Sequence, residues 1–346
     1  MSAGLDDDPA PVFPEDADFE AVQAALTRAG LADGLPQTPP TARRLAAMLA
    51  GVAAPDRSYG QLFPMMGDLT PRAVAYNCVL AGCAPGALPI VLTAANACTA
   101  PDFNLLGLLT TTGTPAIALV VHGPAVQALG MNAGINCLGP GNRANATLGR
   151  ALSLVMRNIG GAKEEIGDMA TMGQPGKYGF CLAEAPDGPF PSLADRRGIP
   201  DGVSAVTVLG VSGTMEVLPL DERDTPEAIL RPVAAALLAA RAVAGSGRVR
   251  PPGEQAFLFP PELAAAVVRA GWDLARVQAY LMDAASIDMP GVARFERAGP
   301  LAEAPGDILA IVTGGPGIKM TCLPLWAGGS VTQTRAILDL ERSDAP

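Results

Sequence analysis

The sequence of 346 residues predicts an α/β fold in which a mixed sheet is flanked by helices. Two related α/β halves are one way in which such a fold could be built. Two apolar runs, at residues 116–121 and 308–312, are rich in β-branched residues and are typical of buried strands. Residues 143–158 instead place Leu148, Leu152 and Val155 on one face, as an amphipathic helix does. With 49% hydrophobic residues, such a chain can bury a large core.

The first half of the chain contains helices with recognisable ends. Pro71 suits the first position of a helix and Gly82 suits its end. Residues 89–98 fit a strand or a helix equally well. We expect helices at residues 19–31, 41–52, 70–83 and 143–158, strands at 116–121 and 178–183, and glycine-rich loops at 123–142 and 160–177.

In the second half, Thr225 and Asp273 are the expected N-caps of two helices, because their side chains can accept a hydrogen bond from a free helical N–H. The apolar runs between helices are short and bounded by glycine and proline. We expect strands at residues 203–209, 257–259 and 308–312, and helices at 226–243, 262–270 and after 273.

The domain organisation follows from composition. Residues 1–16 are acidic and rich in proline, which predicts a disordered tail. The proline-rich span 185–202 is the expected boundary between an N-terminal α/β half, 17–185, and a C-terminal half, 203–340. Both buried strand runs end in a glycine-proline turn, so we compare 116–124 with 308–316 as a possible internal duplication.

Charge and hydropathy exclude several classes of protein. The formal net charge of -10 and the lack of a basic stripe argue against nucleic-acid binding. No apolar run reaches the roughly 18 residues that a membrane-spanning helix needs, and the acidic N-terminal segment lacks the pattern of a signal peptide. We therefore expect a cytoplasmic protein without membrane contact, and a homo-oligomer on general grounds.

Metal and cofactor chemistry receive little support from the sequence. The only histidine is His122, whereas catalytic zinc sites usually draw on several imidazoles. Neither the phosphate-binding loop pattern nor the dinucleotide pattern occurs. The six cysteines are dispersed, which predicts reduced thiols. No cofactor is predicted, and an iron-sulfur cluster or thiolate-bound metal is kept as the alternative.

A glycine-rich loop that runs into the helix at residues 143–158 is the first candidate binding site. Free N–H groups and the positive end of the helix dipole favour an anion there, and Arg143 can clamp a carboxylate. A helix cap alone would explain the same residues. The candidate substrate ligands in this loop are Gly139, Gly141, Asn142, Arg143 and Asn145.

The second glycine-rich loop directly follows the strand at residues 308–312. Ligands of α/β proteins often bind beyond the carboxyl ends of strands. Gly314, Gly315 and Lys319 are therefore candidate ligands of an anion, although Lys319 is equally compatible with an ordinary turn.

A third group of reactive side chains lies near residues 173–184. If residues 178–183 form a strand, Tyr178 and Glu184 share one face while Lys177 and Cys181 share the other. A neighbouring ammonium group would lower the pKa of the Cys181 thiol. The candidate roles are Tyr178 in substrate binding and Lys177, Cys181 and Glu184 in catalysis.

Cys83 and His122 complete the candidate catalytic residues. Cys83 lies beside a glycine-proline turn, and His122 ends a buried strand, where an imidazole can transfer protons. Each has a structural alternative, a buried thiol or a hydrogen-bonded core imidazole. Asp168 and the pair Glu164 and Glu165 are further candidates for proton transfer.

Four stretches of the sequence resemble a bacterial family named UGSC family (seleno)protein. They are AYNCVLAGCAPGALPIVL (75–92), GPGNRANATLGRAL (139–152), GQPGKY (173–178) and CLAE (181–184). The resemblance covers about residues 70 to 320 and implies a redox-active selenocysteine or cysteine. This chain has no Cys-Gly-Ser-Cys segment, and its nearest counterpart is Ala81-Gly82-Cys83.

Three functional hypotheses follow. The first is a small-molecule enzyme, a hydrolase or lyase, that acts on an anionic and most simply carboxylate substrate by cofactor-independent thiol or acid-base chemistry. The second is an iron-sulfur or thiolate-metal enzyme. The third is a non-catalytic protein that binds a small molecule.

Overall fold

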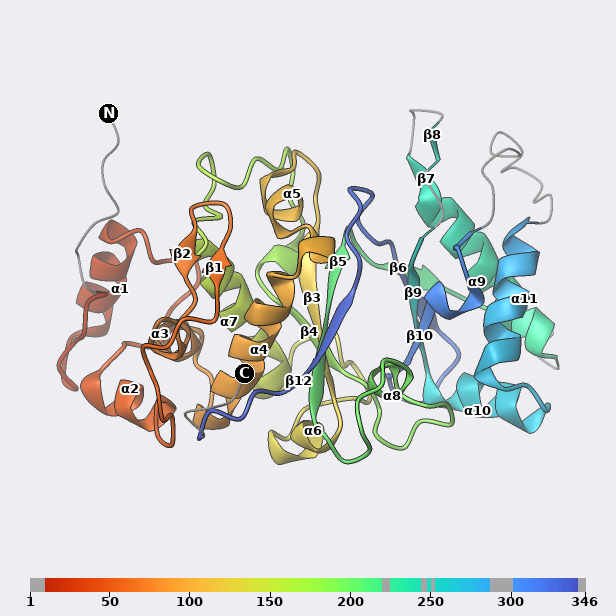
Figure 1. Cartoon of the computed structure of the whole chain (residues 1–346), viewed down its shortest axis with the longest axis horizontal. Coiled ribbons are helices and arrows are strands. Elements are labelled where there is room, and N and C mark those ends of the chain that lie inside the picture. The colour runs from red at the N-terminus through yellow and green to blue at the C-terminus, as the bar shows by residue number, and fades with distance from the viewer. Residues whose placement is uncertain (1–9, 220–224, 244–247, 250–252, 287–300, 342–346) are drawn as a thin grey trace.

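The computed structural model describes residues 10–219, 225–243, 248–249, 253–286 and 301–341. Two four-stranded mixed sheets pack face to face in an α/β fold, with helices on both outer faces (Figure 1). The apolar layer between the sheets includes Ala118, Val120, Leu182, Leu309 and Ile311. Each sheet is therefore covered by the other sheet on one face and by helices on the opposite face.

The first sheet has the strand order β12-β5-β3-β4. Strand β3 pairs in parallel with β4 and antiparallel with β5, which pairs antiparallel with β12. Leu119 and Val121 on β3 face the helices, whereas Ala118 and Val120 face the second sheet. The strands are β3 (Ala116–His122), β4 (Phe180–Ala183), β5 (Ala205–Val211) and β12 (Gln333–Ala336).

The second sheet has the order β10-β9-β11-β6. Strand β9 pairs in parallel with β10 and antiparallel with β11, and β11 pairs antiparallel with β6. The strands are β6 (Met215–Val217), β9 (Gln255–Phe259), β10 (Ile308–Val312) and β11 (Met320–Leu323).

The two sheets share one topology and exchange one strand each. In the first sheet β3 and β4 form the parallel pair and β5 lies antiparallel beside β3. In the second sheet, leaving β6 aside, β9 and β10 form the parallel pair and β11 lies antiparallel beside β9. Strand β6 follows β5 along the chain but pairs with β11, and β12 follows β11 but pairs with β5. Strands β5 and β12, from the C-terminal segment 203–340, thus complete the first sheet. In this arrangement β10 corresponds to β4 and β9 to β3, whereas the sequence comparison of 116–124 with 308–316 matches β3 with β10.

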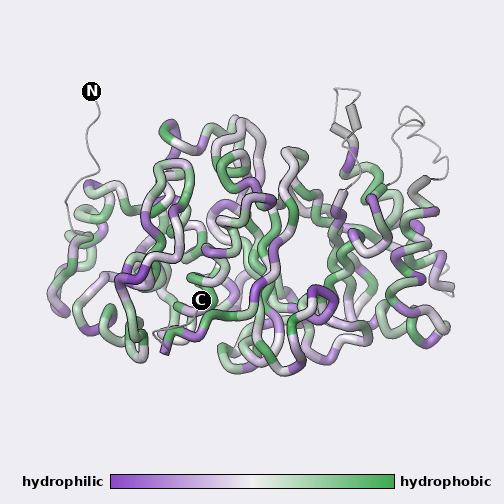
Figure 2. Tube along the Cα trace, in the orientation of Figure 1, coloured by the Kyte–Doolittle hydropathy of each residue, from purple (hydrophilic) through white to green (hydrophobic). Residues whose placement is uncertain are grey.

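Helices flank both sheets, and Figure 2 shows the hydropathy of their residues. Most of the helices are amphipathic, but those at Pro71–Ala81 and Leu88–Cys98 are buried on most sides. Those beside the first sheet contribute to one core cluster and those beside the second sheet to another. The larger helices are α3 (Pro71–Ala81), α4 (Leu88–Cys98), α7 (Arg143–Asn158), α9 (Pro226–Arg241), α10 (Pro261–Arg269) and α11 (Leu274–Ser286).

Helix ends agree with the residues expected to form them. Asn142 caps α7, and the Thr225 and Asp273 side chains accept bonds from Ala228 N and Arg276 N. Gly82 ends α3 in the left-handed conformation, φ 83°. Residues 89–98 form a helix, α4, which begins with proline in its first turn and is buried on nearly every side.

The remaining elements are short. Residues 10–16, expected to be disordered, contact the body: Phe13 bridges to Thr41, and Tyr76 donates to the Pro11 carbonyl. Residues 1–9 lie outside the described residues. The short elements are α1 (Phe19–Arg28), α2 (Ala42–Met48), α5 (Leu105–Thr110), α6 (Pro124–Ala128), α8 (Leu193–Arg196), β1 (Gln61–Leu62), β2 (Gly67–Asp68), β7 (Ala242–Val243) and β8 (Arg248–Val249).

Candidate functional site

A hollow of about 730 Å³ lies between α7 and the loop that joins α7 to β4. Its volume is within the range of small-molecule sites. Lys177, Asp168, Tyr178 and Gln174 from the loop line it together with Ser153 and Arg157 from α7. The hollow is thus built mainly from one helix and the chain segment that follows it, and Asp33 from the segment between α1 and α2 also lines it.

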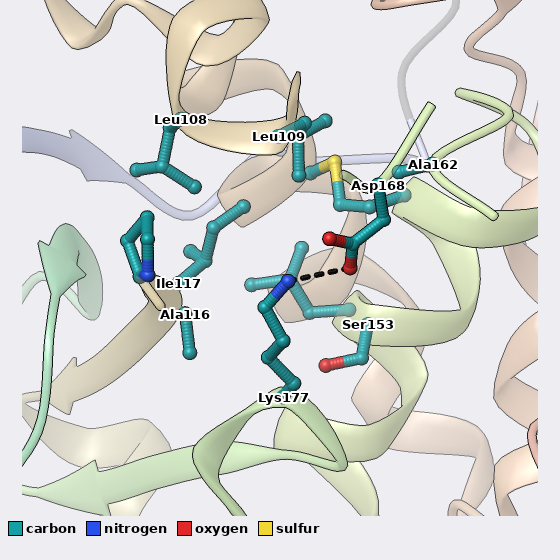
Figure 3. Close-up of a pocket in the computed structure, with 11 residues that line it drawn as sticks. Leu108, Leu109, Ala116, Ile117, Ser153, Ala162, Asp168 and Lys177 are labelled. Atoms are coloured by element: carbon teal, nitrogen blue, oxygen red, sulfur yellow. Dashed lines mark hydrogen bonds and ion pairs between the residues drawn. The ribbon is translucent and has the colours of Figure 1, made fainter. Parts of the chain in front are cut away.

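A smaller apolar niche of about 70 Å³ adjoins the hollow. It lies between α5, α7 and the start of β3, and its walls are mainly aliphatic (Figure 3). Ser153, Ala162, Asp168 and Lys177 line both spaces. The apolar residues that line the niche are Leu108, Leu109, Pro115, Ala116, Ile117, Leu152 and Met156.

Lys177 and Asp168 form an ion pair at the junction of the hollow and the niche. The Lys177 Nζ atom donates to Asp168 Oδ2, and the two side chains are 25% and 23% exposed. In Figure 3 the ammonium group of Lys177 points towards the carboxylate of Asp168. A charged donor and a charged acceptor therefore meet where apolar and polar surfaces adjoin.

The loop is anchored so that this pair is held in place. Gln174 donates from Nε2 to the carbonyls of Thr114 and Val211, which ties the loop to the first sheet. Asp168 accepts a bond from Ala170 N through its other carboxylate oxygen, Oδ1. Lys177 ends a short 3-10 turn, Pro175–Lys177, that directs it back towards Asp168.

Two arginines in and beside the hollow are paired as well. Arg157 bonds Glu164 at 2.6 Å. Burial alone would raise the pKa of Glu164, but its hydrogen bonds and the charge of Arg157 together keep that pKa below its ordinary value. Arg150 forms two bonds of 2.8 and 2.9 Å to Asp33. An anionic ligand in the hollow would therefore share these cations with their carboxylate partners or replace those partners.

Lys177 does not lie on the strand that the sequence predicts. Strand β4 begins at Phe180, so Lys177 and Tyr178 precede it. Burial raises the pKa of the Cys181 thiol, and Cys181 lines neither cavity. The predicted lowering of the Cys181 pKa by Lys177 is therefore wrong, because the turn before the strand breaks the alternation that would place them together.

His122 and Glu184 meet at the opposite end of the first sheet. His122 Nδ1 lies 2.8 Å from Glu184 Oε2, and Nε2 lies 2.8 Å from Thr207 Oγ1. Glu184 also accepts a bond from Leu193 N, and Thr207 contacts Thr334 at 2.8 Å. His122 is 1% and Glu184 3% exposed, so this chain of hydrogen bonds lies in the core.

The candidate thiol Cys83 follows the left-handed Gly82 at the end of α3. A hydrogen bond from the Cys78 thiol lowers the pKa of Cys83, with further lowering by Arg143 and Arg150. Cys83 is 8% exposed and lies outside the hollow and the niche. All six cysteines are buried, and none of them forms a disulfide.

The first glycine-rich loop uses its polar groups internally. Asn142 accepts from Asn145 N and donates to the Gly130 carbonyl, while Asn145 bonds both backbone groups of Asn132 and the carbonyl of Cys137. Arg143 donates twice to the Gly82 carbonyl. Gly139 and Gly141 lie in the same loop. Because the side chains of Asn142, Arg143 and Asn145 bond to the protein itself, these contacts agree with the helix-cap alternative.

The second glycine-rich loop packs on the first. Gly314 N donates to the Ala133 carbonyl, and a Cβ on Gly315 would lie 2.4 Å from Ile135 Cγ1. Lys319 pairs with Glu216 at 3.2 Å and is 62% exposed. The two predicted loops thus come together, but neither borders the Lys177 hollow.

The sequence predicted Lys177, Tyr178 and Asp168 of the hollow as site residues, but not the residues that form the apolar wall of the niche. Leu108 and Leu109 belong to α5, and Ser153 lies on α7, far from Lys177 along the chain. Only the fold brings these segments together. The serine and the leucines carry no local motif that marks them as site residues.

Metal binding and membrane insertion can both be judged for the residues that the structure describes. Within the ranges given above, no group of three or more His, Cys, Asp or Glu side chains is arranged to hold a metal ion. No helix in those ranges has both the length and the apolar character needed to span a bilayer. Comparisons with protein-family models, curated proteins and solved structures found no match to this chain.

Proposed function

We propose that the chain is an enzyme that binds a small carboxylate at Lys177 and uses Asp168 as a general base. The observation that carries this proposal is the partly buried Lys177–Asp168 pair at the junction of a ligand-sized hollow and an apolar niche. None of the described cysteines lines either space. Acid-base chemistry is therefore favoured over the thiol variant of the hypothesis.

Lys177 is the cation that an incoming carboxylate can take over most easily. Arg157 also donates to the Ala32 carbonyl, and Arg150 also donates to the carbonyls of Leu35 and Pro36. Among the described residues, Asp168 is the hydrogen-bond partner found for Lys177 Nζ. A substrate carboxylate that replaces Asp168 keeps Lys177 paired and leaves a carboxylate oxygen of Asp168 free to accept a proton.

The chemistry suited to this arrangement is proton abstraction next to the substrate carboxylate. Asp168 takes the proton from the adjacent carbon, and the electron pair of that C–H bond forms a double bond to the next carbon. The substituent on that carbon leaves with its bonding pair and is protonated by water. Lys177 stabilises the negative charge that develops on the substrate carboxylate. The proposed reaction class is a lyase.

Hydrogen exchange tests this function whatever the leaving group is. Small carboxylates are incubated with the protein in D₂O, and loss of the α-proton signal is followed by NMR, while binding is measured by calorimetry. We expect Lys177→Met to weaken binding more than tenfold and Asp168→Asn to retain binding but abolish exchange. Lys319→Met, which removes an exposed ion-pair lysine outside the hollow, is the matched control.

The outcomes separate the remaining hypotheses. Exchange that survives Asp168→Asn excludes Asp168 as the base. Carboxylate binding that depends on Lys177 without exchange or turnover identifies a binding protein instead of an enzyme. Absence of carboxylate binding by the unmodified protein rejects the proposal as a whole.

A further inference from the structure

We infer that the niche beside Lys177 selects an aliphatic group of about three carbons on the substrate. This inference rests on the proposed function, because it assumes that a carboxylate is held at Lys177. It concerns the substrate class and not the reaction. The observation behind it is the aliphatic niche that adjoins the ion pair.

The chemistry of the niche is aliphatic. Leu109 from α5, Ile117 from β3 and Leu152 from α7 form walls on three sides, with Met156 one helical turn beyond Leu152. Lys177 and Asp168 are the charged residues that line it. These two residues and Ser153 also line the hollow, so the polar groups of the niche lie on the side where it adjoins the hollow. A polar substituent placed among the aliphatic walls would lose its hydration without a compensating hydrogen bond, so that part of the niche disfavours it.

The volume of the niche sets the size of the group. An apolar cavity of about 150 Å³ holds benzene, which has six carbons. The niche is about 70 Å³, slightly less than half of that volume. A propyl or isopropyl group fits such a space, whereas an aromatic ring does not.

The adjoining hollow takes the remainder of the molecule. It is about 730 Å³ and presents charged groups of both signs, including Arg157, Glu164 and Glu165. The substrate class inferred from both spaces is a carboxylic acid with a short aliphatic group on one side and a larger polar group on the other. The carboxylate lies between them at Lys177.

A series of straight-chain acids tests the inference on the full-length protein. Dissociation constants are measured for acetate, propionate, butyrate, pentanoate and hexanoate. Each methylene that enters the niche is expected to tighten binding about fourfold. We expect this gain to continue through butyrate, which places three carbons beyond the carboxylate, and then to stop.

Two substitutions at Leu109 move the limit in opposite directions. Leu109→Ala removes three carbons from the wall, so the gain should continue through pentanoate and hexanoate. Leu109→Phe narrows the niche, so the gain should stop at propionate or acetate. Leu106→Ala is the matched control, because Leu106 lies on the same helix, is 46% exposed and lines neither cavity.

The results distinguish failure of this inference from failure of the proposed function. If the acids bind in a Lys177-dependent manner but with equal affinity at every chain length, only the inference about the niche is overturned. A steady gain through hexanoate in the unmodified protein also overturns it. If no acid binds, the proposed function falls as well. Opposite shifts by the two Leu109 variants cannot result from misfolding and would support the inference.

Discussion

The imidazole Nδ1 of His122 lies 2.8 Å from Glu184 Oε2 in a part of the core where both side chains are almost fully buried. A carboxylate accepts hydrogen bonds and an imidazole nitrogen that carries a proton donates them, so the geometry suits a hydrogen bond between these two atoms. The other ring nitrogen, Nε2, lies 2.8 Å from the Thr207 hydroxyl. His122 is the last residue of β3, and Glu184 directly follows β4. Because β3 and β4 are adjacent parallel strands, the two residues meet at the same edge of the sheet.

His122→Ala should lower the free energy of unfolding by about 3–5 kcal/mol, because it leaves the Glu184 carboxylate buried without its partner. Urea denaturation followed by circular dichroism measures the loss. Arg72→Met is the control, since Arg72 and Asp56 form an exposed ion pair, 57% and 71% accessible, whose removal should have only a small effect. Equal losses for the two variants would contradict a structural role for His122.

Cys83 should react with iodoacetamide faster than the other thiols of the folded protein. The thiolate is the reactive form, and the Cys78 hydrogen bond together with Arg143 and Arg150 lowers the pKa of Cys83. Its alkylation rate should therefore rise at a lower pH than that of free cysteine. Burial raises the pKa of Cys78 and Cys98, so these should react only after unfolding.

Peptide mass spectrometry after timed alkylation identifies the modified cysteine. Cys78→Ala removes the hydrogen-bond donor and should move the rise in rate to higher pH. Cys98→Ala, a buried thiol on α4, should leave the profile of Cys83 unchanged. A profile that does not respond to Cys78→Ala would show that the cysteine pair does not control reactivity.

Gly315→Ala should destabilise the protein by about 1–3 kcal/mol, as overpacking of a tight contact does. The added Cβ would lie 2.4 Å from Ile135 Cγ1 and 2.8 Å from Ile135 Cα, so movement of the side chain alone cannot relieve the overlap. Gly306→Ala is the control, because nothing lies within 4 Å of its Cβ position. Thermal unfolding of both variants measures the contact between the two glycine-rich loops.

Asn145→Ala should cost more stability than Asn142→Ala. Asn145 is 5% exposed, and its side chain makes three hydrogen bonds to backbone groups of Asn132 and Cys137. Asn142 supplies the N-cap of α7, and loss of such a cap costs about 1 kcal/mol. Urea denaturation gives both values. If neither variant is destabilised but carboxylate binding is lost, this loop is a ligand site and not a structural cap.

Sequence patterns predicted the elements whose signal is local. The cap of α7 at Asn142 and the end of α3 at Gly82 depend on side chains or φ angles within a few residues. The ambiguous segment that became α4 is buried on nearly all sides, so it has no polar face to reveal its period. Strands β6, β11 and β12 are only three or four residues long, too short for an alternation of hydropathy to be recognised.

The same division holds for the candidate site. Lys177 and Tyr178 stood out because reactive side chains follow a glycine-rich loop, and Asp168 was among the carboxylates weighed for proton transfer. Their placement on a strand was wrong because a 3-10 turn, Pro175–Lys177, intervenes. The leucines of α5 that complete the niche could not be recognised, since an aliphatic residue has the same local pattern in a core and in a binding site.

The sequence by itself determined the α/β class, the main helices and their caps, and a set of chemically able side chains, because each of these depends on residues close together along the chain. Only the tertiary structure decided the exchange of β6 and β12 between two sheets, the burial of His122 against Glu184, and the meeting of Lys177 with Asp168 beside Leu109. Those relationships depend on which distant segments pack together, and a core of interchangeable aliphatic residues does not specify its partners one by one.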